Sequence, residues 1–124
     1  MSFLVDTNVY IRAFAGKEPD TTFLKKAVHS KSVILSPIIV AEFLPRALKE
    51  EQELFEEVMR AFPLIVIDEE TGRIAAKYRK ASLQTSKTKL IDCFLAAQAK
   101  QHNLTLITNN KSDFPVKDIK VQAP

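Results

Sequence analysis

The chain of 124 residues is 46% hydrophobic and 27% charged, and it carries a formal net charge of +3 at pH 7. This length and balance predict one folded domain over residues 1–124, and they exclude a disordered chain. A single cysteine, Cys93, excludes an intrachain disulfide framework, and only 2 glycines argue against a glycine-rich phosphate loop.

The same composition predicts a cytoplasmic protein without membrane contact. No apolar run approaches the roughly 18 residues that span a bilayer. Asp6 follows the start almost at once, and no basic segment precedes an apolar one, so no signal peptide is expected. The net positive charge permits a polyanionic partner but does not require one.

The first stretch of the chain predicts a buried strand that runs into a helix. Residues 3–5 (Phe-Leu-Val) are apolar without polar alternation, which is typical of a central parallel strand. Asp6, Thr7 and Asn8 favour turns and helix N-caps, and a periodic apolar segment follows over residues 9–14. Asp6 is therefore expected at the carboxyl end of a strand, the edge where open α/β sheets bind ligands.

The rest of the chain alternates short apolar strands with helical segments. The later strands are expected at residues 32–36, 64–67, 104–108 and 119–121. The later helices are expected near residues 20–28, 38–44, 48–62, 68–84 and 86–102, with Pro45 breaking the second of these from the third. This alternation predicts βαβ units, a parallel sheet and a three-layer α/β/α sandwich.

Several acids stand out because of their surroundings. Glu42 and Asp92 each lie inside an apolar helical segment, where a carboxylate loses hydration unless a cation or a hydrogen-bond network meets it. Asp6 and Asp113 each follow an apolar strand, so both belong to the carboxyl edge of the sheet. Four acids from separate segments are thus expected to converge, and a cluster of carboxylate oxygens favours Mg²⁺ or Mn²⁺.

Each acid also has a purely structural interpretation. Asp6 could serve only as an N-cap. Glu42 could pair with Arg46 four residues later, and Asp92 could pair with Lys89 or Lys87. Together these interpretations require a coincidence of placement, so the cluster is the preferred interpretation.

Four segments in order resemble the PIN domain, and most closely the small VapC-type toxin ribonucleases. They are Val5-Asp6-Thr7-Asn8, Val40-Ala41-Glu42-Phe43, Leu90-Ile91-Asp92-Cys93-Phe94-Leu95-Ala96-Ala97, and Leu106-Ile107-Thr108-Asn109-Asn110 with Asp113-Phe114. The resemblance covers essentially the whole chain. It implies a five-stranded parallel sheet of order 3-2-1-4-5, whose topological switch lies between strands 1 and 4.

The resemblance also implies a site and an activity. Asp6, Glu42, Asp92 and Asp113 would hold one or two Mg²⁺ or Mn²⁺ ions and carry out catalysis as a metal-dependent endoribonuclease. Hydrogen bonds from further polar residues would orient those ligands, namely Thr7, Asn8, Thr108 and Asn110. Asn110 stands where many PIN nucleases carry an aspartate, which removes one charge and places more of the metal binding on Asp113.

Partners follow from the same resemblance and from the basic residues. RNA is the expected substrate, a cognate antitoxin is expected to occupy the cleft, and a homodimer is expected. Phe55 and Phe62 could serve such an interface or belong to the core. Basic side chains near the predicted acids are expected to contact phosphates, namely Arg12, Arg46, Lys87 and Lys89.

Two other functions fit parts of the pattern. A catalytically inert PIN-like module would bind or regulate RNA and keep its acids for structure, with Asn110 marking lost activity. A flavodoxin-like receiver domain would explain Asp68-Glu69-Glu70 after the third expected strand. A receiver leaves Glu42 and Asp92 unexplained and lacks paired acids after the first strand.

Overall fold

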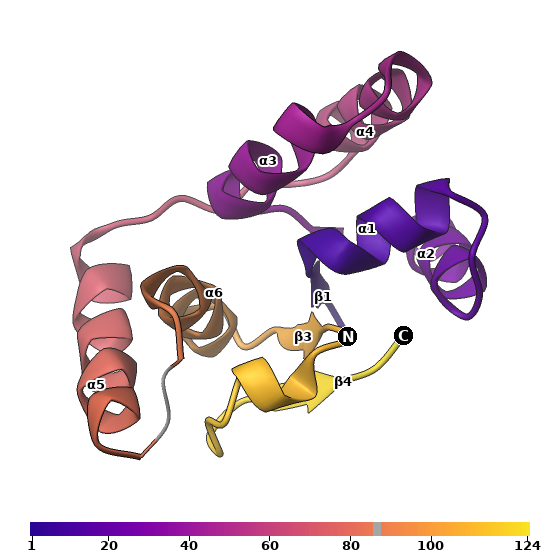
Figure 1. Ribbon diagram of the computed structural model, residues 1–124. Helices are drawn as coiled ribbons and strands as arrows, with labels where there is room; N and C mark the ends of the chain where they lie inside the picture. Colours follow the sequence, from indigo (N-terminus) through magenta and orange to yellow (C-terminus); the bar gives the residue numbers. More distant parts are fainter. Residues whose placement is uncertain (86–87) are drawn as a thin grey trace.

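The computed structural model describes residues 1–85 and 88–124 and shows an α/β fold around a parallel sheet (Figure 1). The strands of the described chain are β1 (Phe3–Val5), β2 (Val33–Ile34), β3 (Thr105–Ile107) and β4 (Lys120–Gln122). They pair in parallel in the order β2-β1-β3-β4. Leu4 of β1 stands opposite Ile34 and Leu106, so the most buried part of the chain lies at the centre of the sheet.

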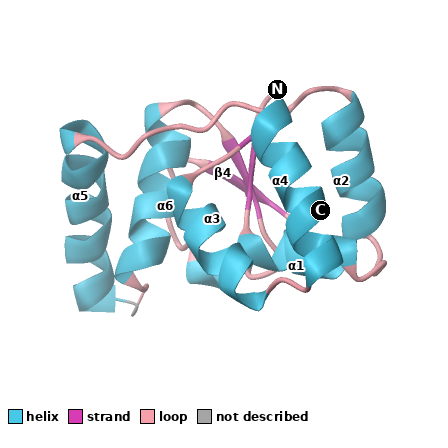
Figure 2. Ribbon diagram, turned by 90° about the horizontal axis from the view of Figure 1, so that it is seen from above, coloured by secondary structure: helices cyan, strands magenta, loops and turns pink. Residues whose placement is uncertain are grey.

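Helices enclose this sheet. They are α1 (Thr7–Phe14), α2 (Asp20–His29), α3 (Pro37–Phe43), α4 (Lys49–Ala61), α5 (Glu69–Thr85) and α6 (Leu90–Gln101), with short 3-10 turns η1 (Leu44–Arg46) and η2 (Lys111–Asp113). Seen from above, α5 and α6 lie side by side at one end of the molecule, and α2 and α4 lie at the other (Figure 2). No helix of the described chain is long and apolar enough to cross a membrane.

Local sequence accounts for most helix boundaries. The α3 helix begins with Pro37 after a Ser36 cap and ends just before the turn that contains Pro45, as predicted. Phe55 of α4 is fully buried and packs against Tyr10 and Phe43, so it belongs to the core. The expected start of the last long helix at Ser86 lies outside the described residues, and α6 begins at Leu90.

The prediction of a five-stranded sheet is wrong for the described chain, because residues 64–67 do not form a strand. Only Leu64 pairs, in one parallel bridge with Leu35, and two backbone hydrogen bonds of 2.8 and 2.9 Å accompany it. Leu35 lies just beyond the two-residue β2, and Pro37 then starts a helix, so no strand remains for pairing. The segment still lies beside β2, where the third strand was expected.

The sheet order places the switch point between β1 and β3. The chain leaves β1 through α1 and returns to β2 on one side, whereas β3 and β4 extend the sheet on the other. Asp6 follows β1 directly, and Thr108 follows β3 directly. Side chains at the ends of these two strands therefore meet at the carboxyl edge, as predicted from the sequence.

Candidate active site

Asp6 is fixed at the carboxyl edge by hydrogen bonds to both of its carboxylate oxygens. It is the N-cap of α1, and its Oδ1 accepts a hydrogen bond of 2.8 Å from the Thr7 amide. Its Oδ2 accepts a hydrogen bond of 2.8 Å from the Thr108 hydroxyl, which comes from the neighbouring strand end. All of these donors are neutral, so the carboxylate is oriented without being paired with a cation.

Glu42 joins Asp6 through Thr7. The Thr7 hydroxyl donates a hydrogen bond of 2.9 Å to Oε1 of Glu42, which projects from α3. Thr7 thus holds one carboxylate through its backbone amide and a second through its side chain. The end of β1 and the last turn of α3 are linked in this way although they are far apart in sequence.

Asp92 and Asp113 complete the group. Asp92 lies in the first turn of α6, and burial followed by the charges of Asp6, Asp113 and Glu42 raises its pKa to about 6. Burial is also the main cause that raises the pKa of Asp6, with smaller contributions from Glu42 and Asp113. The charges of Asp6, Glu42 and Asp113 therefore act on Asp92 in the sense expected of acids gathered at one edge, and Asp113 is exposed on η2.

This group has the chemistry that a hard divalent cation requires. Its four members supply only oxygen donors, and none of them forms an ion pair with a lysine or arginine among the described residues. In the described part of the chain, no three histidine, cysteine, aspartate or glutamate side chains lie close enough together to hold a metal ion as they stand. The donor set therefore fits Mg²⁺ or Mn²⁺ in kind, and binding requires the carboxylates to close around the ion.

The remaining predicted residues take different positions. Asn8 lies in the first turn of α1. The backbone N–H of Asn110 donates a hydrogen bond of 3.0 Å to the Thr108 hydroxyl. Lys89 is the exposed N-cap of α6, and its charge offsets a small part of the rise in the pKa of Asp92 that burial and the neighbouring acids cause. Arg46 is exposed in η1. Lys87 lies outside the described residues.

Arg12 is engaged in a network that sequence reasoning missed. Its Nε lies 3.0 Å from Oδ1 of Asp20, whose side chain is completely buried at the start of α2. Oδ2 of Asp20 accepts a hydrogen bond of 2.7 Å from Asn109, directly after Thr108. The turn that carries Thr108 and Asn110 is therefore joined to the start of α2 and, through Arg12, to α1.

The receiver-like acids have a structural use. Asp68 precedes α5, and its Oδ1 accepts hydrogen bonds from the Thr71 amide at 3.0 Å and the Thr71 hydroxyl at 2.9 Å. Gln101 of α6 also donates to Asp68, at 3.0 Å. These hydrogen bonds lower the pKa of Asp68 to about 2, which is typical of a helix cap.

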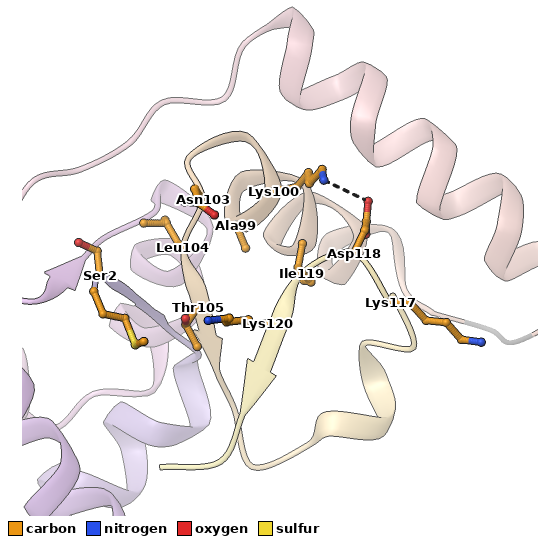
Figure 3. Close-up of a pocket in the computed structure, with 11 residues that line it drawn as sticks. Ser2, Ala99, Lys100, Asn103, Leu104, Thr105, Lys117, Asp118, Ile119 and Lys120 are labelled. Carbon is orange, nitrogen blue, oxygen red and sulfur yellow. Dashed lines mark ion pairs between the residues drawn. The ribbon is translucent and has the colours of Figure 1, made fainter.

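A second hollow lies away from the carboxylates. A cavity of about 550 Å³ opens at the amino edge of the sheet, where Ser2, Thr105 and Lys120 mark the starts of the strands (Figure 3). Asp92 lines only a small space of about 50 Å³ beside Cys93 and Phe114. The cavity at the amino edge is therefore much larger than the space that Asp92 lines.

Solved structures share this fold over nearly their whole length. VapBC2 from Rickettsia felis, bound to a DNA fragment from its promoter, has a TM-score of 0.82 at 18% identity and covers 100% of this chain and 99% of its own. FitAcB from Neisseria gonorrhoeae has a TM-score of 0.78 at 27% identity, covering 98% and 97%. A toxin–antitoxin complex from Klebsiella pneumoniae has a TM-score of 0.73 at 25% identity, covering 97% and 99%.

Sequence comparison points the same way. No curated protein matches the chain. The profile of the PIN domain family matches residues 3–120, which includes all four acids of the carboxyl edge. The chain therefore belongs to the PIN domain family.

Proposed function

We propose that this chain is a metal-dependent endoribonuclease and the toxin of a toxin–antitoxin pair. What supports the proposal is that Thr7 joins Asp6 to Glu42 by hydrogen bonds and that the charges of Asp6, Asp113 and Glu42 raise the pKa of Asp92, while none of the four acids has an ion pair among the described residues. Membership of the PIN family supports it, as does the likeness to a toxin–antitoxin complex at 25% identity. A cognate antitoxin and a second copy of the chain are proposed as its protein partners.

The roles follow from where each side chain is held. Asp6 and Asp92 would hold the ion, with Asp113 completing its surroundings. When bound, Mg²⁺ or Mn²⁺ supplies Lewis-acid activation of water and neutralises phosphate charge. Thr7 and Thr108 keep the carboxylates aimed, which lowers the cost of ordering them when an ion arrives.

Glu42 is placed to orient the water that attacks the phosphodiester. One of its carboxylate oxygens already accepts from Thr7, which leaves the other oxygen to accept from water. In-line attack forms a bond from the water oxygen to phosphorus and breaks the bond to the 3′ oxygen. The attacking water releases one proton to solvent and the departing 3′ oxygen takes up one proton from solvent, so the products are a 5′-phosphate and a 3′-hydroxyl.

The test is cleavage of a mixed pool of structured RNA by the purified, partner-free chain. Reactions contain Mg²⁺, Mn²⁺ or EDTA and compare the unaltered protein with Asp6→Asn and Asp92→Asn. Glu57→Gln, which changes an exposed carboxylate of α4, is the matched control. We expect metal-dependent cleavage that both site variants lose and the control retains, with circular dichroism showing that all four proteins are folded.

Two results would contradict the proposal. Cleavage that persists in EDTA and in both site variants would indicate another chemistry or a contaminating nuclease. Folded protein that binds RNA in EDTA but never cleaves it would favour the inert RNA-binding module instead.

A further inference from the structure

Three exposed lysines mark the segment that connects the two edges of the sheet. Lys111 lies in η2, two residues before Asp113, at the carboxyl edge. Lys117 lies in the loop that follows, and Lys120 begins β4 opposite Thr105 at the amino edge. None of the three lysines forms an ion pair within the described residues, so each ammonium group remains available.

Two acids lie between these lysines, and one of them, Asp118, is already engaged within the fold, whereas Asp113 belongs to the carboxylate group. A carboxylate oxygen of Asp118 lies 3.7 Å from Nζ of Lys100 (Figure 3). The other carboxylate oxygen accepts a hydrogen bond of 2.9 Å from the hydroxyl of Tyr78. The carboxylate of Asp118 therefore interacts with side chains of α6 and α5, and it forms no ion pair with Lys117 or Lys120. The segment from Lys111 to Lys120 carries three lysines and two aspartates, so its formal net charge is +1.

The amino edge adds a concave surface to this charge. The cavity of about 550 Å³ is lined by Lys100, Lys117 and Lys120 together with polar groups of Ser2 and Asn103. In Figure 3, Lys120 reaches across the start of β3 beside Thr105, whereas Lys117 extends outward from the loop. A phosphate group that enters from solvent would meet ammonium groups on this side.

Negative charge is concentrated elsewhere on the molecule. The α4 helix carries five glutamates, Glu50, Glu51, Glu53, Glu56 and Glu57, and it lies away from β4 (Figure 1). None of these glutamates pairs with a lysine or arginine in the described part of the chain. A polyanion is thus repelled by the α4 face and attracted by the β4 face.

We propose that Lys111, Lys117 and Lys120 form a lysine track that binds the phosphate backbone of RNA beyond the carboxylate site. The proposal rests on the proposed ribonuclease function, because Lys111 starts the track beside Asp113. The track would favour structured RNA that is long enough to reach both edges.

The experiment measures RNA binding in EDTA, so that it does not depend on cleavage. The probe is a fluorescein-labelled RNA hairpin of about 20 base pairs, long enough to cross the sheet from edge to edge. The track variant is Lys111→Gln with Lys117→Gln and Lys120→Gln. The control variant is Lys17→Gln with Lys25→Gln and Lys26→Gln, which removes the same charge from exposed positions on and before α2.

We expect the track variant to bind the hairpin at least about ten-fold more weakly than the unaltered chain at low salt. The slope of the logarithm of the binding constant against the logarithm of the salt concentration should become shallower by about 2. Each lysine–phosphate contact that is lost reduces the magnitude of this slope by about 0.7 to 0.9. The control variant should stay within about two-fold of the unaltered chain.

Equal weakening by both variants would overturn the track, since net charge alone would then explain binding. Unchanged binding by the track variant would overturn it as well. Duplex DNA of the same length that displaces the hairpin more effectively than RNA does would overturn the assignment to RNA. If the track variant binds weakly as expected while the unaltered chain never cleaves RNA, the track stands and the ribonuclease function fails.

Discussion

Replacing Asp92 by asparagine should stabilise the metal-free protein. Burial, followed by the charges of Asp6, Asp113 and Glu42, raises the pKa of the Asp92 carboxyl from 3.8 to about 6, so its ionised form is disfavoured in the folded state. The amide of asparagine has nearly the same shape but no charge. The substitution therefore removes an unfavourable interaction without opening a cavity.

The expected size follows from this pKa. A rise of about 2 units corresponds to about 3 kcal/mol of lost stability at neutral pH for a fully buried group. Asp92 is only partly buried, and solvent screening lowers the expected gain of Asp92→Asn to about 1 kcal/mol. For a domain of this length, about 1 kcal/mol moves Tm upward by about 4 °C.

The gain should depend on pH in a defined direction. Because the folded state holds the Asp92 proton more tightly than the unfolded state does, the protein is stabilised below about pH 4 and loses this stabilisation as pH rises through about 6. The asparagine variant does not titrate at this position. Its advantage over the unaltered chain should therefore be near zero at about pH 4 and complete above about pH 6.

The assay is thermal unfolding in EDTA at several pH values, followed by circular dichroism. Glu57→Gln serves as the control, and it should change the free energy of unfolding by less than about 0.5 kcal/mol. Mn²⁺ should then raise Tm of the unaltered chain. At a concentration of 100 times Kd, the ion adds up to about 2.7 kcal/mol to the free energy of unfolding, and it should barely affect Asp92→Asn. A variant that is no more stable than the unaltered chain at pH 7, or whose gain persists at pH 4, would refute the reasoning.

Two further substitutions test the orientation of the site and the packing of the core. Thr108→Val removes the hydroxyl that aims Asp6 and should weaken Mn²⁺ binding by about 10-fold or more in calorimetry, whereas Thr108→Ser should restore it. Tyr10→Phe should stabilise the fold by about 1 kcal/mol in urea unfolding, because the completely buried Tyr10 hydroxyl has no hydrogen-bond partner among the described residues. A loss of stability in Tyr10→Phe would mean that a buried water satisfies that hydroxyl in solution.

Much of the fold could be predicted because local signals agree with the tertiary structure. The strand at residues 3–5, the Asp6 cap and the break near Pro45 each depend on neighbouring residues alone. The segment at residues 64–67 is as apolar as a strand, yet Leu64, Val66 and Ile67 are exposed by 44 to 63%. Its pairing depends on how far β2 extends, and β2 ends early because Pro37 begins a helix.

Local pattern could place Asp6 after a strand and Asp92 in the first turn of a helix, and both positions agree with the structure. Glu42 lies in the last turn of α3, not at its start, so its place in the site depends on tertiary packing. The hydrogen bonds that orient the acids could not be predicted from the sequence. Thr7 donates to Glu42 across 35 positions and Thr108 donates to Asp6 across 102 positions. The first contact depends on how α3 packs against α1, and the second depends on the pairing of β1 with β3. No local pattern encodes either arrangement.

Asp20 was missed for a similar reason, and it differs from the site acids in how its charge is compensated. The side chain of Asp20 is completely buried, but Arg12 and Asn109 meet both of its oxygens. Asp20→Asn should therefore destabilise the protein by about 1 to 2 kcal/mol, since it removes the charge from a bonded pair and weakens one hydrogen bond. The same aspartate-to-asparagine change should thus have opposite signs at Asp20 and at Asp92. Urea unfolding of both variants in EDTA measures this contrast, and stabilisation by Asp20→Asn would show that the buried pair with Arg12 costs more in lost hydration than it returns.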